Sequence, residues 1–264
     1  MRLSPDGSRI AIGARDQRLG TSDVFIHEIA RGLTRQLTSE PGTENTPGWT
    51  PDSLSVVYTA DRHGPPNLHM RSIDGIGPEK ELLPPSNSGP QSPGMFTSNG
   101  GTLVYVAANE KTGYDIMSMP IDHHSPPVAI AATKGRDSSP RITTDDRWLA
   151  FSTNESGRSE VYVQPLNDPR GRRQVSRDGG IEPRWRGDGR ELYFVSGADR
   201  TQMMAVDLTT TGGAIEPGVP RLLFVRHARI YDFDVTKDGK QFLLISINSI
   251  AERGTLSVWR DWIK

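Results

Sequence analysis

Five aspartates and one asparagine recur along this sequence at a spacing of 43 to 50 residues. The recurring positions are Asp6, Asp52, Asn99, Asp145, Asp188 and Asp238. Carboxylates in series suit cation binding, but the Asp-x-Asp-x-Asp loop of calcium sites is missing. Each recurring residue lies in an Asp-Gly turn or a similar one, where Asp accepts hydrogen bonds from its own backbone. The pattern therefore favours repeated turns over a metal site.

The six histidines do not form a metal-binding pattern, because none has the His-x-x-x-His spacing of a helical ligand pair. His123 and His124 precede Ser125-Pro126-Pro127, which predicts an exposed turn. Cysteine is absent, which excludes disulfides, thiol catalysis and Cys-ligated zinc. We expect no metal and no cofactor.

Catalytic motifs are also missing. No Gly-x-Ser-x-Gly nucleophile elbow occurs, so the hydrolase half of a peptidase is absent from this chain. Asp232-Phe233-Asp234 lacks the glycine of the kinase motif, and Gly75-Ile76-Gly77 lacks the third glycine of a dinucleotide loop. We therefore expect no catalytic residues and no enzyme activity.

The composition limits which partners and which fold class we expect. Thirty-one basic residues balance 32 acidic ones, so the net charge of −1 gives no reason to expect nucleic acid. No apolar run approaches the ~18 residues of a membrane span, and no signal peptide is visible, so the compartment is unknown from sequence. The 27 glycines and 20 prolines favour many short strands joined by turns.

The recurring turns divide the chain into six similar repeats. Each has a first strand near a proline such as Pro47 or Pro183, and a second that is a short apolar run. Since proline lacks an N–H, we expect it at the start of the first strand. Third strands are expected at Val24–Ile29, Leu68–Ile73, Ile116–Ile121, Val161–Leu166, Met203–Leu208 and Leu256–Trp262. Weaker fourth strands are expected at Arg35–Thr38, Glu81–Leu83, Val128–Ile130, Arg173–Ser176 and Arg221–Val225.

A four-stranded antiparallel unit of this length is typical of a propeller blade. The sequence thus predicts an all-β, six-bladed β-propeller that forms a single domain over residues 1–264. The blades are expected at about 1–40, 41–86, 87–132, 133–178, 179–227 and 228–264. The last blade lacks its outer strand, so we expect it to be incomplete. One explanation is that the chain is a fragment of a larger protein. We also expect self-association through the exposed edge Leu256–Trp262.

The repeats resemble the WD-like blades of TolB and of the propellers in prolyl-oligopeptidase-type enzymes, most closely at Ser4–Ile12, Pro47–Tyr58 and Pro183–Phe194. The tail from Leu256 to Lys264 resembles the end of propellers fused to bacterial serine/threonine kinases. The resemblance implies a non-catalytic scaffold that binds a protein or peptide, TolB-like or the sensor of a bacterial receptor kinase, in a periplasmic or extracytoplasmic location. The alternative is the substrate-gating propeller of a serine peptidase whose catalytic domain is absent.

Loops on a rigid scaffold carry function, and the loops that enter the first strand of each repeat differ most between copies. We expect them to form a mixed-charge rim that binds the partner. The candidate rim residues are Glu44, Asn45, Gln91, Arg136, Asp137, Glu182, Arg184, His227, Arg229 and Tyr231.

Two further groups of residues carry simpler expectations. The tryptophans follow the repeat and should fill the space between sheets; they are Trp49, Trp148, Trp185, Trp259 and Trp262. The basic cluster Arg170-Gly171-Arg172-Arg173 should be a solvated turn, so Arg172→Ala should change stability by less than about 0.5 kcal/mol.

Overall fold

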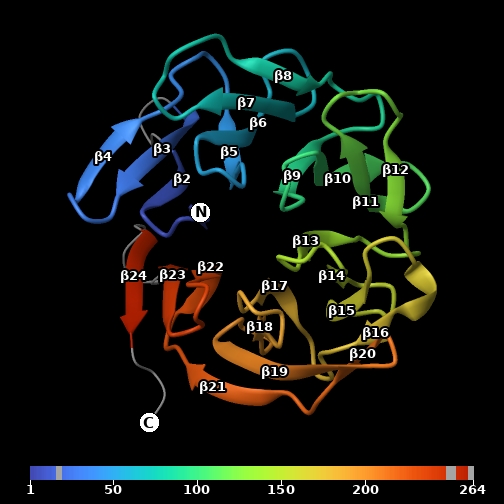
Figure 1. Cartoon of the computed structure of the whole chain (residues 1–264). Coiled ribbons are helices and arrows are strands. Elements are labelled where there is room, and N and C mark those ends of the chain that lie inside the picture. Colours follow the sequence, from blue (N-terminus) through green and yellow to red (C-terminus); the bar gives the residue numbers. More distant parts are fainter. Residues whose placement is uncertain (16–19, 248–253, 261–264) are drawn as a thin grey trace. The chain divides into compact units, whose positions relative to one another are not determined.

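The strands form six antiparallel sheets in the computed structural model, which describes residues 1–15, 20–247 and 254–260 (Figure 1). For residues 247 and 254–260 only the backbone is described. Contacts divide the chain into two compact units, Met1–Ala129 and Ile130–Lys264. The only helix in the described residues is the short 3-10 turn η1, Pro169–Gly171, so the all-β class is confirmed.

The sheets of the first unit contain four strands each, joined in sequence order. The first sheet contains β1 (Arg2–Leu3), β2 (Arg9–Arg15), β3 (Ser22–Glu28) and β4 (Leu33–Gln36). The second contains β5 (Glu44–Trp49), β6 (Ser55–Ala60), β7 (Asn67–Ser72) and β8 (Lys80–Leu83). The third contains β9 (Gln91–Phe96), β10 (Thr102–Asn109), β11 (Gly113–Pro120) and β12 (Val128–Ala131).

The sheets of the second unit have the same order but differ in strand number. The fourth sheet contains β13 (Ser138–Ile142), β14 (Trp148–Thr153), β15 (Glu160–Pro165) and β16 (Arg173–Gln174). The fifth contains β17 (Ile181–Trp185), β18 (Glu191–Ser196), β19 (Gln202–Thr211), β20 (Ala214–Pro217) and β21 (Arg221–Val225). The sixth contains β22 (Arg229–Val235), β23 (Gln241–Ile247) and β24 (Gly254–Arg260), so it has three strands in the described part of the chain.

The recurring acidic residues close the hairpin between the first and second strands of each sheet. In all six copies the Oδ1 atom accepts the backbone N–H two residues later, as Asp52 does from Leu54 at 2.9 Å. A Ser or Thr hydroxyl two residues earlier donates to the same Oδ1 in five copies. Hydrogen bonds from Thr50 and Leu54 hold the pKa of Asp52 below its ordinary value. The recurrence of acidic residues is therefore a feature of the turns.

The residue after each of these acidic positions adopts the left-handed backbone conformation. Glycine occupies it in four copies, whereas Ser53 and Asp146 have φ values of 62° and 57°. A left-handed L-residue costs energy that glycine avoids. We expect Asp146→Gly to raise the free energy of unfolding by about 0.5–1 kcal/mol. Urea unfolding would check this, and a loss of stability would contradict the turn assignment.

Packing between sheets uses the tryptophans of the repeat. Trp49 and Trp148 are buried, and Trp185 is partly buried against the same cluster as Trp148. The Trp49 indole N–H donates to the Arg2 carbonyl at 3.0 Å, and that of Trp185 donates to the Arg141 carbonyl at 2.9 Å. Each bond reaches the first strand of the preceding sheet. These three tryptophans pack as expected, whereas Trp262 lies outside the described residues and Trp259 is described by backbone alone.

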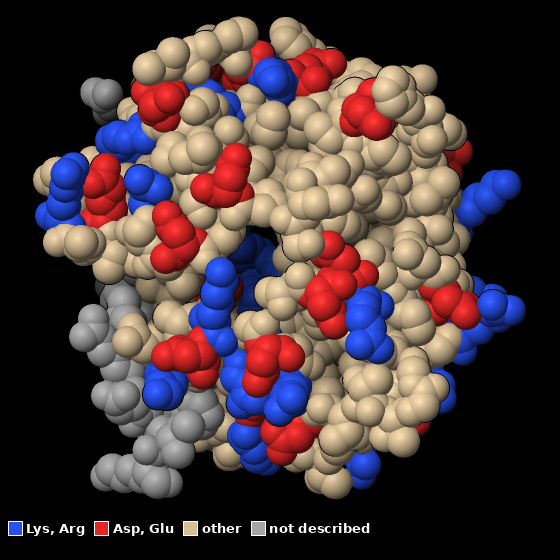
Figure 2. Space-filling model, viewed as in Figure 1, with Lys and Arg blue, Asp and Glu red and all other residues tan. Residues whose placement is uncertain are grey.

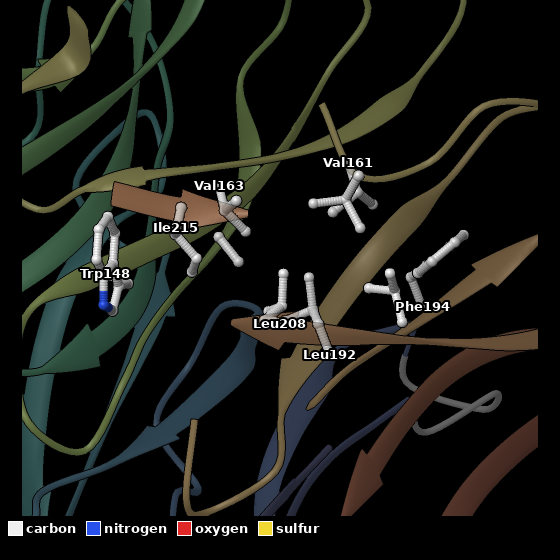
Figure 3. Close-up of a cluster of buried hydrophobic side chains, with 10 residues drawn as sticks. Trp148, Val161, Val163, Leu192, Phe194, Leu208 and Ile215 are labelled. Carbon is white, nitrogen blue, oxygen red and sulfur yellow. The ribbon is translucent and has the colours of Figure 1, made fainter. Parts of the chain in front are cut away.

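One core cluster of the second unit lies between the fourth and fifth sheets (Figure 3), and another lies between the fifth and sixth sheets. β14 and β15 contribute Trp148, Val161 and Val163, and β18 to β20 contribute Leu192, Phe194, Leu208 and Ile215. Alternating side chains of a strand point to opposite faces, so these strands present one apolar face to the neighbouring sheet. The apolar face of each sheet is therefore covered by the neighbouring sheet.

Three details differ from the sequence expectations. The prolines do not begin their strands: Pro47, Pro140 and Pro183 lie inside β5, β13 and β17, at bulges where the register shifts. β20 was not predicted, because it forms by a hairpin that extends the outer part of one repeat only. Arg172 is not merely solvated, since it pairs with Glu155 at 2.6 Å and lies over the Tyr162 ring.

Candidate functional site

The first strands of three sheets share a strained bulge immediately before a proline. Thr46, Ser139 and Glu182 have φ values of 47°, 54° and 55° at equivalent positions of β5, β13 and β17. Non-glycine residues in this region cost of the order of 1–3 kcal/mol and cluster at binding sites. In the second unit two of these bulges meet, because the Ser139 hydroxyl donates to Glu182 Oε1 at 2.8 Å.

The residue after the bulge proline distinguishes the two units. In the first unit it is Gly48, where an added Cβ would lie 3.2 Å from Val57 and 3.4 Å from the Gly94 carbonyl. In the second unit it is a buried arginine, Arg141 or Arg184. Each arginine uses Nη1 to donate to the carbonyl of its own proline, at 2.7 Å and 2.8 Å. Burying a guanidinium requires compensation by hydrogen bonds and opposite charges.

Around Arg184 the compensation comes from three carboxylates, which we call the carboxylate cage: Glu182, Asp232 and Asp234. Arg184 Nη2 lies 3.1 Å from Glu182 and 3.0 Å from Asp232, and Nε lies 3.7 Å from Asp234. The Arg184 side chain is 3% exposed, but those of Glu182, Asp232 and Asp234 are 26%, 17% and 15% exposed. All three carboxylates thus surround one buried guanidinium and keep part of their own surface accessible.

β22 supplies two carboxylates of the cage, Asp232 and Asp234, and also carries exposed residues. The pairing of β22 with β23 skips Tyr231, which is the extra residue of a bulge between Ile230 and Asp232. Tyr231 is 59% exposed. Arg229 and His227 are also exposed. β-Bulges change the direction of side chains and are common next to binding sites. An exposed tyrosine is a frequent anchor of protein interfaces.

Several of the expected rim residues are instead buried. Glu44 is fully buried and accepts from Arg62 Nε at 3.0 Å. Gln91 is buried and donates to the Pro84 carbonyl at 3.2 Å. Asp137 is buried and accepts the Thr133 N–H and hydroxyl at 2.8 Å and 2.7 Å. These side chains satisfy polar groups of the loops themselves.

Asn45 and Arg136 are exposed, in different units. The structure therefore brings together only Glu182 and Arg184 directly, with Arg229 and Tyr231 on the strand that supplies the cage. Sequence reasoning missed Asp232 and Asp234, as well as the second buried arginine, Arg141. The Pro-Arg dipeptide that recurs one repeat later, at Pro140-Arg141 and Pro183-Arg184, was the available signal.

The first unit contains a different polar cluster, which is closed. Glu79 accepts two hydrogen bonds from Arg62, both at 2.9 Å, lies 2.6 Å from His69 Nδ1 and accepts from the Tyr58 hydroxyl. His69 Nε2 contacts the Asn67 side chain at 3.1 Å, so both ring nitrogens are occupied. No group of three metal-ligating side chains occurs in the residues that the structure describes. These contacts join side chains of β6 and β7 to Glu79 within the first unit.

Charges on the molecular surface are mixed. Figure 2 shows acidic and basic side chains interspersed on the drawn face, with neither sign covering it. Such a surface gives no single-sign field for long-range steering, so recognition depends on individual groups such as the cage. Within the described residues, no helix has the length and apolarity to cross a bilayer.

Comparison with known proteins agrees with this architecture. Residues 2–129 match the TolB beta propeller domain family. The Tol-Pal system protein TolB of Francisella tularensis subsp. tularensis is 26% identical over 168 residues, which cover 62% of this chain and 38% of that protein. The chain thus spans well under half the length of that relative.

Solved structures extend the likeness to nearly the whole chain. TolB from Acinetobacter baumannii aligns with a TM-score of 0.76 at 15% identity, over 97% of this chain and 61% of that one. A puromycin-hydrolysing peptidase of Mycobacterium tuberculosis aligns with a TM-score of 0.63 at 18% identity, over 96% of this chain and 44% of that one. At these identities the structures establish a shared propeller fold. The resemblance found in the repeats is confirmed: residues 2–129 match the TolB beta propeller domain family, and nearly the whole chain shares the propeller fold of TolB.

Proposed function

We propose that this chain is a non-catalytic binding module that recognises a partner protein through the carboxylate cage and the exposed residues of β22. The observation that carries the proposal is that β22 presents partly exposed carboxylates, held around the buried Arg184, on the same strand as the exposed Tyr231. The buried Arg184 guanidinium donates hydrogen bonds to Glu182 and Asp232, which holds these carboxylates in place and preorganises the cage for a ligand. Preorganisation lowers the entropy cost of binding.

The chemistry of the cage indicates which group of the partner it receives. A lysine, an arginine or an amino terminus is the group that forms charge-assisted hydrogen bonds with partly exposed carboxylates such as these. Tyr231 offers a rigid aromatic surface beside that charge, and few side-chain torsions are lost when it is covered. We therefore expect a protein segment with a basic residue next to an apolar or aromatic one.

The family relationship supports a protein as the partner. The curated relatives are named as proteins of the Tol-Pal system, so a component of such a system is the first partner to test. The same resemblance supports our proposal of a periplasmic or extracytoplasmic location. The second candidate function is the substrate-gating propeller of a peptidase, which the likeness to the puromycin-hydrolysing peptidase keeps open.

The test is titration calorimetry with purified Tol-Pal components of the same bacterium. Tyr231→Ala should weaken binding about tenfold or more, because truncating an aromatic anchor typically costs 2 kcal/mol or more. Its melting temperature should stay unchanged, since Tyr231 is exposed. Arg170→Ala is the matched control, because Arg170 is an exposed residue elsewhere in the same unit, with 89% of its side chain accessible.

Equal affinity of the wild-type protein and Tyr231→Ala would place the partner elsewhere on the chain. Turnover of a peptide substrate that one substitution in this chain abolishes would refute the non-catalytic part of the proposal. Stimulation of a separate hydrolase domain by this chain would favour the gating function instead.

A further inference from the structure

β19 extends beyond the strand on its inner side. Its pairing with β18 ends at Asp207, opposite Glu191. Beyond that point Leu208–Thr211 pairs only with β20, on the other side, through the hairpin around Gly212 and Gly213. The end of β19 therefore has one edge that no described strand occupies.

The hydrogen bonds show which backbone groups this edge presents. The Leu208 N–H donates to the Arg190 carbonyl at 2.8 Å, whereas the Asp207 carbonyl accepts from Gly218 on the opposite side at 2.8 Å. Since backbone groups alternate sides along a strand, Thr210 faces the same side as Leu208. The Leu208 carbonyl and the Thr210 N–H and carbonyl thus form a short, unpaired strand edge among the described residues.

A groove of about 560 Å³ lies along this edge, between the fourth and fifth sheets. Its walls come from the β13–β14 turn, the β17–β18 turn and β19. A second hollow of about 330 Å³ shares Arg147 and Trp148 with it and continues past Leu166. Ligand sites in proteins commonly fall in this range of volume.

The floor of the groove is apolar and its rim is balanced in charge. Trp148 and Leu208 line it and belong to the core cluster that also contains Ile215 (Figure 3). On the rim the Asp188 carboxylate is already held by Arg186, at 2.8 Å. Asp145 lies 3.9 Å from Arg147. The charged residues that line the groove are two acidic and two basic side chains, Asp145, Asp188, Arg147 and Arg190, so its lining has no formal net charge.

We propose that this groove binds an extended segment of a partner polypeptide, which pairs with Leu208–Thr210 as an added strand in line with β18. An extended backbone is the ligand whose alternating N–H and carbonyl groups match the unpaired edge. An uncharged apolar side chain of that segment would lie on Trp148 and Leu208. This second site is separate from the carboxylate cage, and it would bind a partner even if the cage does not.

The experiment uses the full chain, labelled with nitrogen-15, and capped seven-residue peptides in which threonine alternates with valine around one central residue. With leucine or phenylalanine at the centre, saturable shifts should appear at the Thr210 amide and the Trp148 indole. With glutamate or lysine at the centre, binding should be at least about tenfold weaker, because the charge would be buried without a partner. Binding at the β22 residues without shifts at Thr210 would refute the groove.

Thr210→Pro tests the edge directly, because it removes an N–H that the β19–β20 ladder does not use. Its affinity for the leucine peptide should fall about tenfold, the loss of roughly one hydrogen bond plus a steric clash. Thr209→Ala is the control and should bind like the wild type, since Thr209 faces β20 with its backbone groups. Unchanged affinity of Thr210→Pro would overturn the proposal.

A second measurement does not depend on how the proline variant folds. Methylating the peptide nitrogens that face β19 should abolish binding to the wild-type protein, whereas methylating the alternate set should leave binding nearly unchanged. Equal effects of the two sets would exclude strand addition. If the groove is instead an interface between two copies, the unliganded protein would be a dimer that Thr210→Pro converts to a monomer, and that result would also refute a partner peptide as the occupant.

Discussion

Glu79→Gln should lower the free energy of unfolding by about 2–4 kcal/mol, the range for removing one partner of a buried ion pair that keeps some other contacts. The substitution preserves the shape of the side chain but replaces one acceptor oxygen by a donor. Arg62, His69 and Tyr58 would then lose a carboxylate that all three contact. Denaturant unfolding followed by tryptophan fluorescence measures the difference.

The pH dependence of this difference identifies its cause. Burial acts to raise the pKa of the Glu79 carboxyl, but hydrogen bonds from His69, Arg62 and Tyr58 outweigh it and hold the pKa well below the ordinary value of 4.5. A carboxyl whose pKa is lower in the folded state contributes stability above its unfolded pKa and loses it as the pH falls. The gap between wild type and Glu79→Gln should therefore be full at pH 7 and shrink below about pH 4.5.

Glu44→Gln is the matched control, because Glu44 contacts the same Arg62. Burial raises the pKa of Glu44, more than the Arg62 contact lowers it. A carboxyl with a raised pKa contributes stability below its unfolded pKa and loses it as the pH rises. Glu44→Gln should thus cost less than about 1 kcal/mol at pH 7, and a cost equal to that of Glu79→Gln would contradict the assigned roles.

Trp185→Ala should destabilise the protein by about 3–5 kcal/mol, the range for removing a large aromatic side chain from a core. Trp185 packs on the cluster around Trp148 and its indole holds the Arg141 carbonyl at 2.9 Å. The change leaves both a cavity and an unpaired carbonyl next to a buried arginine. The same unfolding experiment, at pH 7, measures it.

Arg172→Ala provides the comparison on the surface of the same unit. In the wild type, Arg172 pairs with Glu155 and lies over the Tyr162 ring. The expected loss of unfolding free energy therefore rises from less than about 0.5 to about 1 kcal/mol. The two variants should still differ by 2 kcal/mol or more. Similar costs for both would show that the register of the repeats is misplaced.

The strands could be predicted from sequence because each repeat contains its own turn chemistry. The Asp-centred turn fixes the hairpin locally, and the apolar run after it fixes the buried face; β21 (Arg221–Val225), for example, has the expected bounds. β20 was missed because its residues, Ala214–Pro217, have no counterpart in the other repeats. Comparing the repeats identifies the strands that all copies share, but it does not reveal a strand that is inserted in one copy only.

The candidate site was harder to predict for a physical reason. Glu182 and Arg184 were expected at the rim, but their partners Asp232 and Asp234 lie one repeat away and inside a strand. The left-handed bulge at Glu182 turns these side chains toward one another, and no local propensity indicates such a bulge before a proline. Glu44 shows the converse, because a charged loop residue was expected in solvent and is instead buried.

The indole hydrogen bonds of Trp49 and Trp185 have a consequence for how unfolding spreads. Each bond ties a sheet to the first strand of the sheet before it, whereas the Asp-centred turns are closed within a few residues. Stability is then close to a sum of terms for individual repeats and terms for neighbouring pairs, as in a one-dimensional array. Trp185 contributes both this hydrogen bond and part of the apolar packing between the fourth and fifth sheets. Hydrogen exchange in Trp185→Ala should therefore accelerate most in these two sheets and least in the first.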